Sequence, residues 1–333
     1  MKPKLLIVEL WGLGDLIIAT PFLQAAAARF DVTLLAQPYA LDLRRRLWPD
    51  VRVVTFVAPW TAFKNKYRLW QWPWREILQL RKRLDEERFD YGLSARWDPR
   101  DHLLLKLFGA RERIGFPRLH SGAFLTRPLE RPDPECHRYE SWRTVARALD
   151  LELPVREKIP IPPVKAERTV LVHTGAGQPV RVWPLENYRR LVTRLREKKI
   201  PVQVACDPDQ RDWWQRTGEK TVATPITVTE LIELTDRAGV FIGNDSGPGH
   251  LAAFCGVPTL TIFGPQLPEW FVPLHPKAAW IEGKVCPYLP CSDYCRFPTP
   301  FCLWNIKEDE VIRATEGFLA ANLPANAVSA TPA

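Results

Sequence analysis

Three loops of the sequence carry glycines and polar side chains suited to chemistry on a phosphorylated ligand. The first, Gly12-Leu13-Gly14-Asp15, directly follows an apolar run. Its two glycines let the backbone turn tightly and approach a ligand, and the carboxylate of Asp15 can take a proton from an attacking hydroxyl group. The alternative is that Asp15 only caps the following helix. The loop is not the dinucleotide fingerprint G-x-G-x-x-G, because Ile17 replaces the third glycine.

The second loop runs from Gly243 to His250 and reads GNDSGPGH. Small and polar residues between an apolar run and a helix leave backbone N–H groups beside a helix N-terminus, which is an anion site suited to a diphosphate. The side chains of Ser246 and His250 can add hydrogen-bond donors. The alternative is a tight turn with a satisfied histidine, but the density of glycine favours a ligand-binding loop.

The third loop, His173-Thr174-Gly175-Ala176-Gly177, again follows an apolar run and precedes a helix. Arg181 stands a few residues further on, and its guanidinium can bind phosphate oxygens bidentately. We expect Arg181 to reach across a cleft to such a phosphate. The alternative is an arginine on the solvated surface.

Alternating apolar runs and helical segments must position these loops. The expected strands are residues 4–10, 32–36, 51–57, 89–95, 169–173, 202–205, 240–242 and 259–263. The expected helices lie within 16–30, 77–88, 102–108, 184–198 and 250–255. This alternation predicts an α/β protein with parallel sheets. Because ligands bind at the carboxyl ends of such strands, the three loops belong to one predicted site.

The proline-rich stretch near residue 153 divides the chain into two α/β series. We predict an N-terminal Rossmann-like domain over 1–160, a linker over about 153–167, a second Rossmann-like domain over 168–322 and a disordered tail over 323–333. The predicted fold class is therefore α/β, with two doubly wound domains facing across a cleft.

Together these motifs resemble the lipopolysaccharide heptosyltransferases, glycosyltransferase family 9, from Leu5 to about Ile312. The resemblance rests on Gly12-x-Gly14-Asp15 with Thr20-Pro21, on residues 244–253, on Arg181-x-Trp183-Pro184, on Gly256-Val257-Pro258-Thr259 and on Phe263-Gly264-Pro265. It implies a GT-B fold, an ADP-heptose donor, inversion at the anomeric carbon and no cofactor or essential metal. The N-terminal domain would then take the acceptor and the C-terminal domain the nucleotide sugar.

Residue by residue, the resemblance makes Asp15 the catalytic base. It assigns the donor to Gly14, Thr174, Gly175, Arg181, Asp245, Ser246, Gly247, Gly249 and His250. Members of the family usually carry Lys where this chain has Arg181. Arginine keeps the positive charge but binds a phosphate with a different geometry. The implied acceptor is a lipopolysaccharide core or a related anionic glycolipid. Two alternatives remain: another nucleotide sugar or acceptor, or a non-catalytic nucleotide-binding relative.

Four cysteines are clustered late in the chain, at Cys286, Cys291, Cys295 and Cys302. Four thiols over so short a stretch suit zinc or an iron–sulfur cluster, but the paired C-x-x-C units of common zinc sites are missing. The alternatives are a metal site, a disulfide, and free or packed thiols, of which the last is favoured. No metal is therefore predicted.

The stretch from Trp60 to Arg88 interleaves tryptophans with basic residues. Such a mixture suits an anionic lipid head group or a membrane surface, and the formal net charge of +8 agrees with an anionic partner. We predict acceptor or membrane contacts at Lys64, Lys66 and Arg68, against the alternatives of a solvated loop or nucleic acid. No nucleic-acid module is recognisable, so no nucleic-acid partner is expected.

The first 28 residues superficially imitate a signal peptide. Glu9 and Asp15 interrupt the apolar run, however, and Gly12 and Gly14 would break its helix. No run of 18 apolar residues occurs, so no transmembrane helix is expected. The expected location is the cytoplasm, with peripheral contact to the inner face of the inner membrane.

Overall fold

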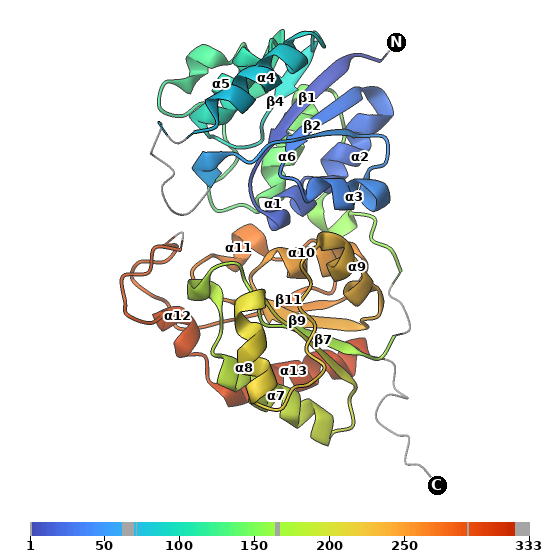
Figure 1. Cartoon of the computed structure of the whole chain (residues 1–333), viewed down its shortest axis with the longest axis vertical. Coiled ribbons are helices and arrows are strands. Elements are labelled where there is room, and N and C mark those ends of the chain that lie inside the picture. Colours follow the sequence, from blue (N-terminus) through green and yellow to red (C-terminus); the bar gives the residue numbers. More distant parts are fainter. Residues whose placement is uncertain (1, 62–69, 71, 164–166, 292, 324–333) are drawn as a thin grey trace. The chain divides into compact units, whose positions relative to one another are not determined.

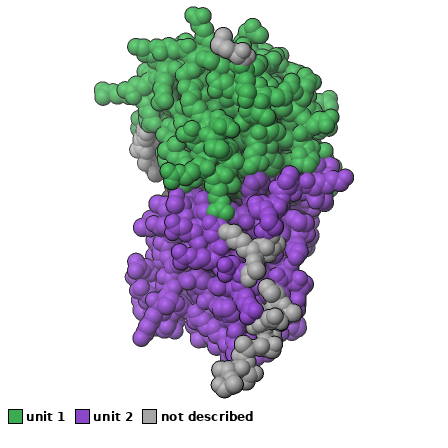
Figure 2. All heavy atoms as spheres, turned by 90° about the vertical axis from the view of Figure 1, so that its right-hand side faces the viewer, with its two compact units in different colours: residues 1–154 green, residues 155–333 purple. Residues whose placement is uncertain are grey.

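The computed structural model describes residues 2–61, 70, 72–163, 167–291 and 293–323. The chain divides into two compact units, Met1–Pro154 and Val155–Ala333, and each is described by itself (Figure 2). The division lies at the proline-rich stretch.

Unit 1 is built on a six-stranded parallel sheet in the order β3-β2-β1-β4-β5-β6 (Figure 1). Its strands are β1 (Lys4–Glu9), β2 (Asp31–Ala36), β3 (Arg52–Thr55), β4 (Tyr91–Leu93), β5 (Glu112–Gly115) and β6 (Arg127–Pro128). Its helices are α1 (Leu13–Ile18), α2 (Thr20–Arg29), α3 (Ala40–Leu47), α4 (Trp74–Asp85), α5 (Pro99–Leu107) and α6 (Tyr139–Ala148), with short 3₁₀ turns at Pro59–Thr61 and Ser121–Phe124.

Helices cover both faces of the unit 1 sheet because its central strands are apolar on both sides. Leu6 and Val8 of β1 pack into one cluster with residues of α4 and α5. The alternate residues Leu5 and Ile7 are equally buried and face the other way. Helices α2 and α6 contact one another through Phe22 and Trp142, whose ring centroids are 5.1 Å apart.

Unit 2 is built on a five-stranded parallel sheet in the order β11-β10-β9-β7-β8. Its strands are β7 (Val170–His173), β8 (Val202–Ala205), β9 (Val240–Asn244), β10 (Thr259–Phe263) and β11 (Ala279–Glu282). Its helices are α7 (Leu185–Glu197), α8 (Arg211–Arg216), α9 (Val228–Asp236), α10 (Gly247–Phe254), α11 (Pro268–Phe271), α12 (Phe301–Trp304) and α13 (Glu308–Asn322), with 3₁₀ turns at Arg156–Lys158, Pro179–Arg181 and Pro208–Gln210.

Alternate residues of the unit 2 strands enter two different cores. Val170 and Ile242 join a cluster with α7 and α13, whereas Leu171 and Phe241 join a cluster with α10. This alternation is that of a sheet covered on both faces. The predicted doubly wound architecture is thus confirmed in each unit. The domain limits and the cleft remain predictions.

Candidate active site

Each sheet has one point where the strand order reverses, and the loops of interest lie there. In unit 1, β1 lies between β2 and β4, so the chain turns to opposite sides after β1 and after β4. In unit 2, β7 lies between β8 and β9 in the same way. Loops diverge at such a switch point and open a crevice at the carboxyl ends of the strands, where ligands of open α/β sheets bind.

Asp15 follows β1 in the first turn of α1, beside the partly exposed Gly14. One carboxylate oxygen accepts a hydrogen bond from the backbone N–H of Gly12 at 3.2 Å, so the capping interpretation is confirmed. The other oxygen forms an ion pair with Arg96, which follows β4. The Asp15 side chain keeps 22% of its surface exposed. Capping and access to a ligand therefore coexist in this carboxylate.

A pocket opens at this switch point. Its lining residues are Glu9, Asp15, Ile18, Ala95, Arg96, Trp97, Arg138, Ser141 and Trp142. Glu9 is the last residue of β1, and its carboxylate lies 3.9 Å from the Arg96 guanidinium. Burial, more than the neighbouring charge of Asp15, raises the pKa of Glu9 to about 7, against the opposing effect of Arg96. The site thus holds a second carboxyl group that changes charge near neutral pH.

Sequence reasoning missed Glu9, Arg96 and Arg138 as site residues. A signal for Glu9 existed, because it is a carboxylate within an otherwise apolar strand. Arg96 also follows a predicted strand, which is where a ligand-binding side chain is expected. Nothing in the sequence singled out Arg138, which comes to the pocket from the residue before α6.

In unit 2, the side chain of Asn244 joins the two switch-point loops. Its amide nitrogen donates to the carbonyl of Thr174 at 2.8 Å. Its amide oxygen accepts from the backbone N–H of Trp183 at 3.0 Å and from the hydroxyl of Tyr188 at 2.9 Å. Asn244 is fully buried. This network fixes the end of β9 relative to the end of β7.

Thr174 is also committed to the interior. Its hydroxyl donates to the side-chain oxygen of Gln210 at 2.7 Å and accepts from the indole N–H of Trp214 at 3.2 Å. Thr174 is fully buried. The Thr174 hydroxyl is therefore engaged within the core of unit 2, and contact of Thr174 with a diphosphate remains a prediction.

The glycine loop after β7 encloses the carboxylate of Asp207. The N–H groups of Ala176 and Gly177 donate to one oxygen of Asp207 at 2.9 and 3.0 Å. A Cβ placed on Gly175 would lie 2.1 Å from the other oxygen, so this position requires glycine. The loop has the form of an anion-binding nest, but an internal anion fills it. Contact of Gly175 with a diphosphate remains a prediction.

Helix α10 begins directly after β9 and presents the other predicted donor contacts. Ser246 is its N-terminal cap, and Gly247, Pro248 and Gly249 form its first turn. The first N–H groups of a helix have no partner within the helix and attract anions. Gly247 and Pro248 are partly exposed. Pro248 has no N–H, and the N–H of Gly249 donates to the carbonyl of Ser246 at 3.2 Å.

His250 lies one turn into α10 and is 5% exposed. Its Nδ1 has no hydrogen-bond partner among the described residues. Burial, with a smaller contribution from the charge of Arg181, lowers the pKa of His250 to about 4. At neutral pH it is an uncharged imidazole whose buried nitrogen is available to a polar ligand group.

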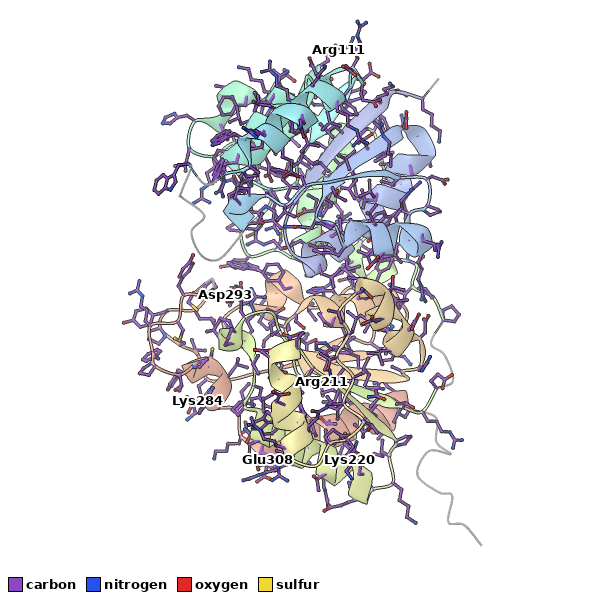
Figure 3. The ribbon with its side chains drawn as sticks, in the orientation of Figure 1. Arg111, Arg211, Lys220, Lys284, Asp293 and Glu308 are labelled. Carbon is purple, nitrogen blue, oxygen red and sulfur yellow. The ribbon has the colours of Figure 1, made fainter. Side chains whose placement is uncertain are left out.

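Arg181 lies between two carboxylates of its own unit. Its guanidinium makes two hydrogen bonds of 2.7 Å to Asp293, which Figure 3 labels, and one of 3.3 Å to Asp245. The two aspartate side chains are only 5% and 4% exposed, while that of Arg181 is 23% exposed. Arg181 and Asp245, both predicted as donor-site residues, contact one another, and no pattern in the sequence indicates Asp293 as the third partner.

The four late cysteines line a single pocket of unit 2, between β11 and α12. All four are free thiols. Burial raises the pKa of Cys302 to about 11, which favours the neutral thiol. Within the described part of the chain, no group of three or more His, Cys, Asp or Glu side chains is arranged to hold a metal. The absence of a metal at these cysteines remains a prediction.

The predicted acceptor contacts Lys64, Lys66 and Arg68 lie outside the described residues. Around them, Trp60 is buried and packs against Trp72 in a tilted arrangement, with ring centroids 4.9 Å apart. Trp70 is 77% exposed and Trp74 is 48% exposed. No helix among the described residues has the length and apolar character needed to cross a membrane.

Two α/β units, each built on a parallel sheet, are the architecture of the GT-B fold. A family model described as glycosyltransferase family 9 (heptosyltransferase) matches residues 77–296. The chain belongs to this family.

Two curated relatives agree. The chain is 26% identical over 360 residues to lipopolysaccharide heptosyltransferase 1 of Pseudomonas aeruginosa, covering 96% of this chain and 98% of that protein. It is 26% identical over 171 residues to lipopolysaccharide heptosyltransferase 3 of Escherichia coli K12, an alignment that spans 46% of this chain and 47% of that protein.

Solved structures share the fold. The E. coli heptosyltransferase WaaC with ADP has a TM-score of 0.73 at 16% identity, covering 95% of this chain and 99% of that one. The iron-containing heptosyltransferase TibC, in complex with ADP-D-beta-D-heptose, has a TM-score of 0.59 at 16% identity, covering 96% of this chain and 78% of that one. At these identities, the likeness establishes the GT-B fold.

Proposed function

We propose that the chain transfers heptose from ADP-heptose to a hydroxyl group of a lipopolysaccharide core glycolipid, with inversion at the anomeric carbon. The observation that carries this proposal is the partly exposed carboxylate of Asp15 at the switch-point pocket of a family 9 chain. Binding of ADP and ADP-heptose by the solved relatives supports this choice of donor.

In the proposed reaction, the acceptor oxygen attacks the anomeric carbon on the face opposite the diphosphate. A new carbon–oxygen bond forms as the bond to the diphosphate breaks, and ADP leaves with that electron pair. The proton of the hydroxyl passes to the carboxylate of Asp15. General-base catalysis of this kind contributes about 10²–10⁴-fold to a rate.

The diphosphate would bind at the N-terminus of α10. The partly exposed Gly247 and the unpartnered Nδ1 of His250 support this placement, and Ser246 and Gly249 lie in the same turn. Negative charge grows on the leaving group in the transition state, so fixed N–H dipoles stabilise it there more than in the ground state. Arg181 and Asp245 would complete the donor site.

No step of this reaction needs a metal ion, since the helix dipole and a guanidinium can neutralise a departing diphosphate. We therefore propose metal-independent transfer without a cofactor. For the location, we propose the cytoplasm, with Lys64, Lys66 and Arg68 bringing the enzyme to anionic lipid at the inner face of the membrane.

The test is transfer from ADP-heptose by wild type and by Asp15→Asn, with lipopolysaccharide core glycolipid as acceptor. We expect the variant to lose about 10³-fold in kcat and to keep its ADP affinity. NMR of the product anomer reports inversion. Asp50→Asn, at an exposed aspartate of the same unit, is the matched control. Near wild-type turnover by Asp15→Asn would remove the base assignment.

A second candidate, a transferase of the same fold with another donor, is favoured by the clamp of two carboxylates on Arg181. Such a clamp partly neutralises the cation that a diphosphate would meet. A thermal-shift screen with ADP-, UDP-, GDP- and dTDP-sugars separates the two candidates, because the ligand that binds the folded state raises the unfolding midpoint. The ADP-sugars should give the largest shift.

A further inference from the structure

The ion pair between Asp15 and Arg96 conflicts with the role of a base. One oxygen of the Asp15 carboxylate is paired with the guanidinium of Arg96 and the other accepts a hydrogen bond from the N–H of Gly12, so both oxygens are already engaged. An oxygen paired in this way is blocked from accepting the proton of a hydroxyl group. In this state, Asp15 is therefore held in an arrangement from which the reaction must release it.

Arg96 has alternatives to Asp15 close at hand. Its guanidinium lies 3.9 Å from Glu9 and 5.0 Å over the ring of Trp11. It keeps 25% of its side-chain surface exposed, at the pocket. A guanidinium stacked on an indole is supported on its face while its edge remains able to bind a carboxylate or phosphate.

A second guanidinium lines the same pocket. Burial, and then the positive charge of Arg96, lowers the pKa of Arg138 to about 10. The two cations are thus close enough to repel one another inside a partly buried space. Arg138 also lies 4.6 Å over the ring of Trp97. Two supported guanidinium groups at one pocket favour an anion that both can bind.

The carboxyl groups around Arg96 do not cancel this charge. Asp98 is held by Arg100, with a nitrogen–oxygen distance of 2.5 Å. Asp101 is buried, and burial raises its pKa well above the ordinary value, so that its neutral form is favoured. Glu9 titrates near neutral pH. Among the described residues that line the pocket, Asp15 makes the closest ion pair with Arg96.

We propose that Arg96 and Arg138 form a subsite for an anionic group of the acceptor sugar, and that binding of this anion takes Arg96 away from Asp15. The chemical class of the group is a carboxylate or a phosphate. Once released, Asp15 accepts the proton of the attacking hydroxyl. The inference rests on the proposed transfer, and it makes the acceptor's own charge the trigger that frees the base.

The first arm of the test is binding, which needs no donor. Calorimetry compares glucose 6-phosphate, galacturonic acid and glucose with the full-length chain. We expect each anionic sugar to bind at least about tenfold more tightly than glucose, and the tighter of the two identifies phosphate or carboxylate. Arg96→Gln and Arg138→Gln should each remove this preference. Arg127→Gln, at an exposed ion pair of the same unit, should keep it.

The second arm reads Asp15 directly. The ¹³C carboxyl signal of Asp15, assigned with Asp15→Asn, should move on addition of the tighter anionic sugar and stay in place with glucose. Arg96→Gln should show the moved signal without any sugar. Equal binding of all three sugars, or an Asp15 signal that ignores the anion, overturns the proposal. If Arg96→Gln unfolds, Arg96→Lys replaces it in the test, because lysine keeps the positive charge but cannot bind an anion bidentately.

The third arm is turnover. Arg96→Gln should lower transfer to an anionic acceptor by about 30-fold or more, while slow hydrolysis of ADP-heptose by water, which carries no anion, stays equal or rises. An equal fall of both rates means that Arg96 only positions Asp15, and overturns the proposal. Absence of any turnover by the wild type refutes the proposed transfer, and the first two arms still decide the subsite.

Discussion

The two switch points of the molecule lie at equivalent places in two similar sheets, yet they are built from opposite chemistry. At the β1–β4 switch point, Asp15 meets Arg96 through charges that stay partly exposed. At the β7–β9 switch point, Asn244 and Thr174 meet through neutral hydrogen bonds that are fully buried. The first is an ion pair in which an anionic ligand can replace one partner. The second is a buried hydrogen-bond network that fixes the ends of two strands.

This difference follows from what each site is proposed to do. An ion pair at partial exposure has a net free energy of only about 0–1 kcal/mol, so a competing anion can replace one partner at little cost. A buried amide with three satisfied hydrogen bonds is costly to disturb, because its partners would be left unpaired. A base needs the first arrangement, whereas a preorganised diphosphate site needs the second.

The largest expected difference between the two switch points is therefore in how much a substitution lowers the free energy of unfolding. Asn244→Ala leaves the N–H of Trp183 and the hydroxyl of Tyr188 without this acceptor, and the carbonyl of Thr174 keeps only the longer hydrogen bond from Gln210, at 3.3 Å. We expect a loss of about 3–5 kcal/mol in the free energy of unfolding, measured by urea denaturation. Asp15→Asn should lose less than about 1 kcal/mol.

Asn305→Ala is the matched control for Asn244, because its amide makes one exposed hydrogen bond, to the carbonyl of Phe301. It should change the free energy of unfolding by about 0.5 kcal/mol. Similar losses for Asn244→Ala and Asn305→Ala would show that the hydrogen-bond network of Asn244 does not stabilise unit 2, and the contrast between the two switch points would disappear.

The second prediction concerns pH. Glu9 has an ordinary pKa of 4.5 in the unfolded chain and about 7 in the folded one. The folded state holds this proton more tightly, so its contribution to stability is full below pH 4.5 and is lost as pH rises through 7. The loss amounts to about 3 kcal/mol. Glu9→Gln cannot ionise and should lack it.

Urea denaturation of the wild type and Glu9→Gln at pH 5 and pH 8 measures this effect. The hydrogen bond from the N–H of Trp11 to the Glu9 side chain can be kept by the amide oxygen of Gln. The same pH dependence in both proteins would mean that Glu9 is ionised throughout, and that the pocket of unit 1 carries one more fixed negative charge.

The sequence predicted the central strands because each is an apolar run bounded by polar or glycine residues, as in β1 and β10. It also placed α7, whose predicted range 184–198 differs by one residue at each end from Leu185–Glu197. The helix α13 was not predicted, since its apolar positions are diluted by small residues such as Ala314 and Gly317. The edge strand β11 was missed because it is not a continuous apolar run: its residues alternate between partly buried and exposed.

For the site, the sequence reached the loops but not their long-range partners. Thr174 and Asn244 are 70 residues apart, and no local pattern states that one accepts from the other. Arg181 and Asp293 are 112 residues apart. A glycine-rich loop looks the same in sequence whether a ligand or the carboxylate of Asp207 fills it. Such long-range partners are brought together only when the whole sheet of unit 2 has formed.

The third prediction tests the filled loop of unit 2. Gly175→Ala would place a methyl group within 2.1 Å of the carboxylate of Asp207. We expect a loss of about 1–3 kcal/mol in the free energy of unfolding. The double variant Gly175→Ala/Asp207→Ala should lose less free energy of unfolding than the sum of the losses of the two single variants, because the clash is gone. Strict additivity would contradict the close approach of these residues.

The smallest expected effect lies at Arg181. Asp293→Asn removes one of the two charges that hold the guanidinium, and Asn tolerates the left-handed backbone of this position, at a φ of 70°. The freed cation should meet a diphosphate more strongly, so ADP should bind about three- to tenfold more tightly, a gain that salt should reduce. Calorimetry with ADP measures it, and Asp212→Asn, at an exposed aspartate of the same unit, is the control. A weaker affinity would instead assign Asp293 to positioning Arg181, and the donor site would then be held as rigidly by charge as Asn244 holds it by neutral hydrogen bonds.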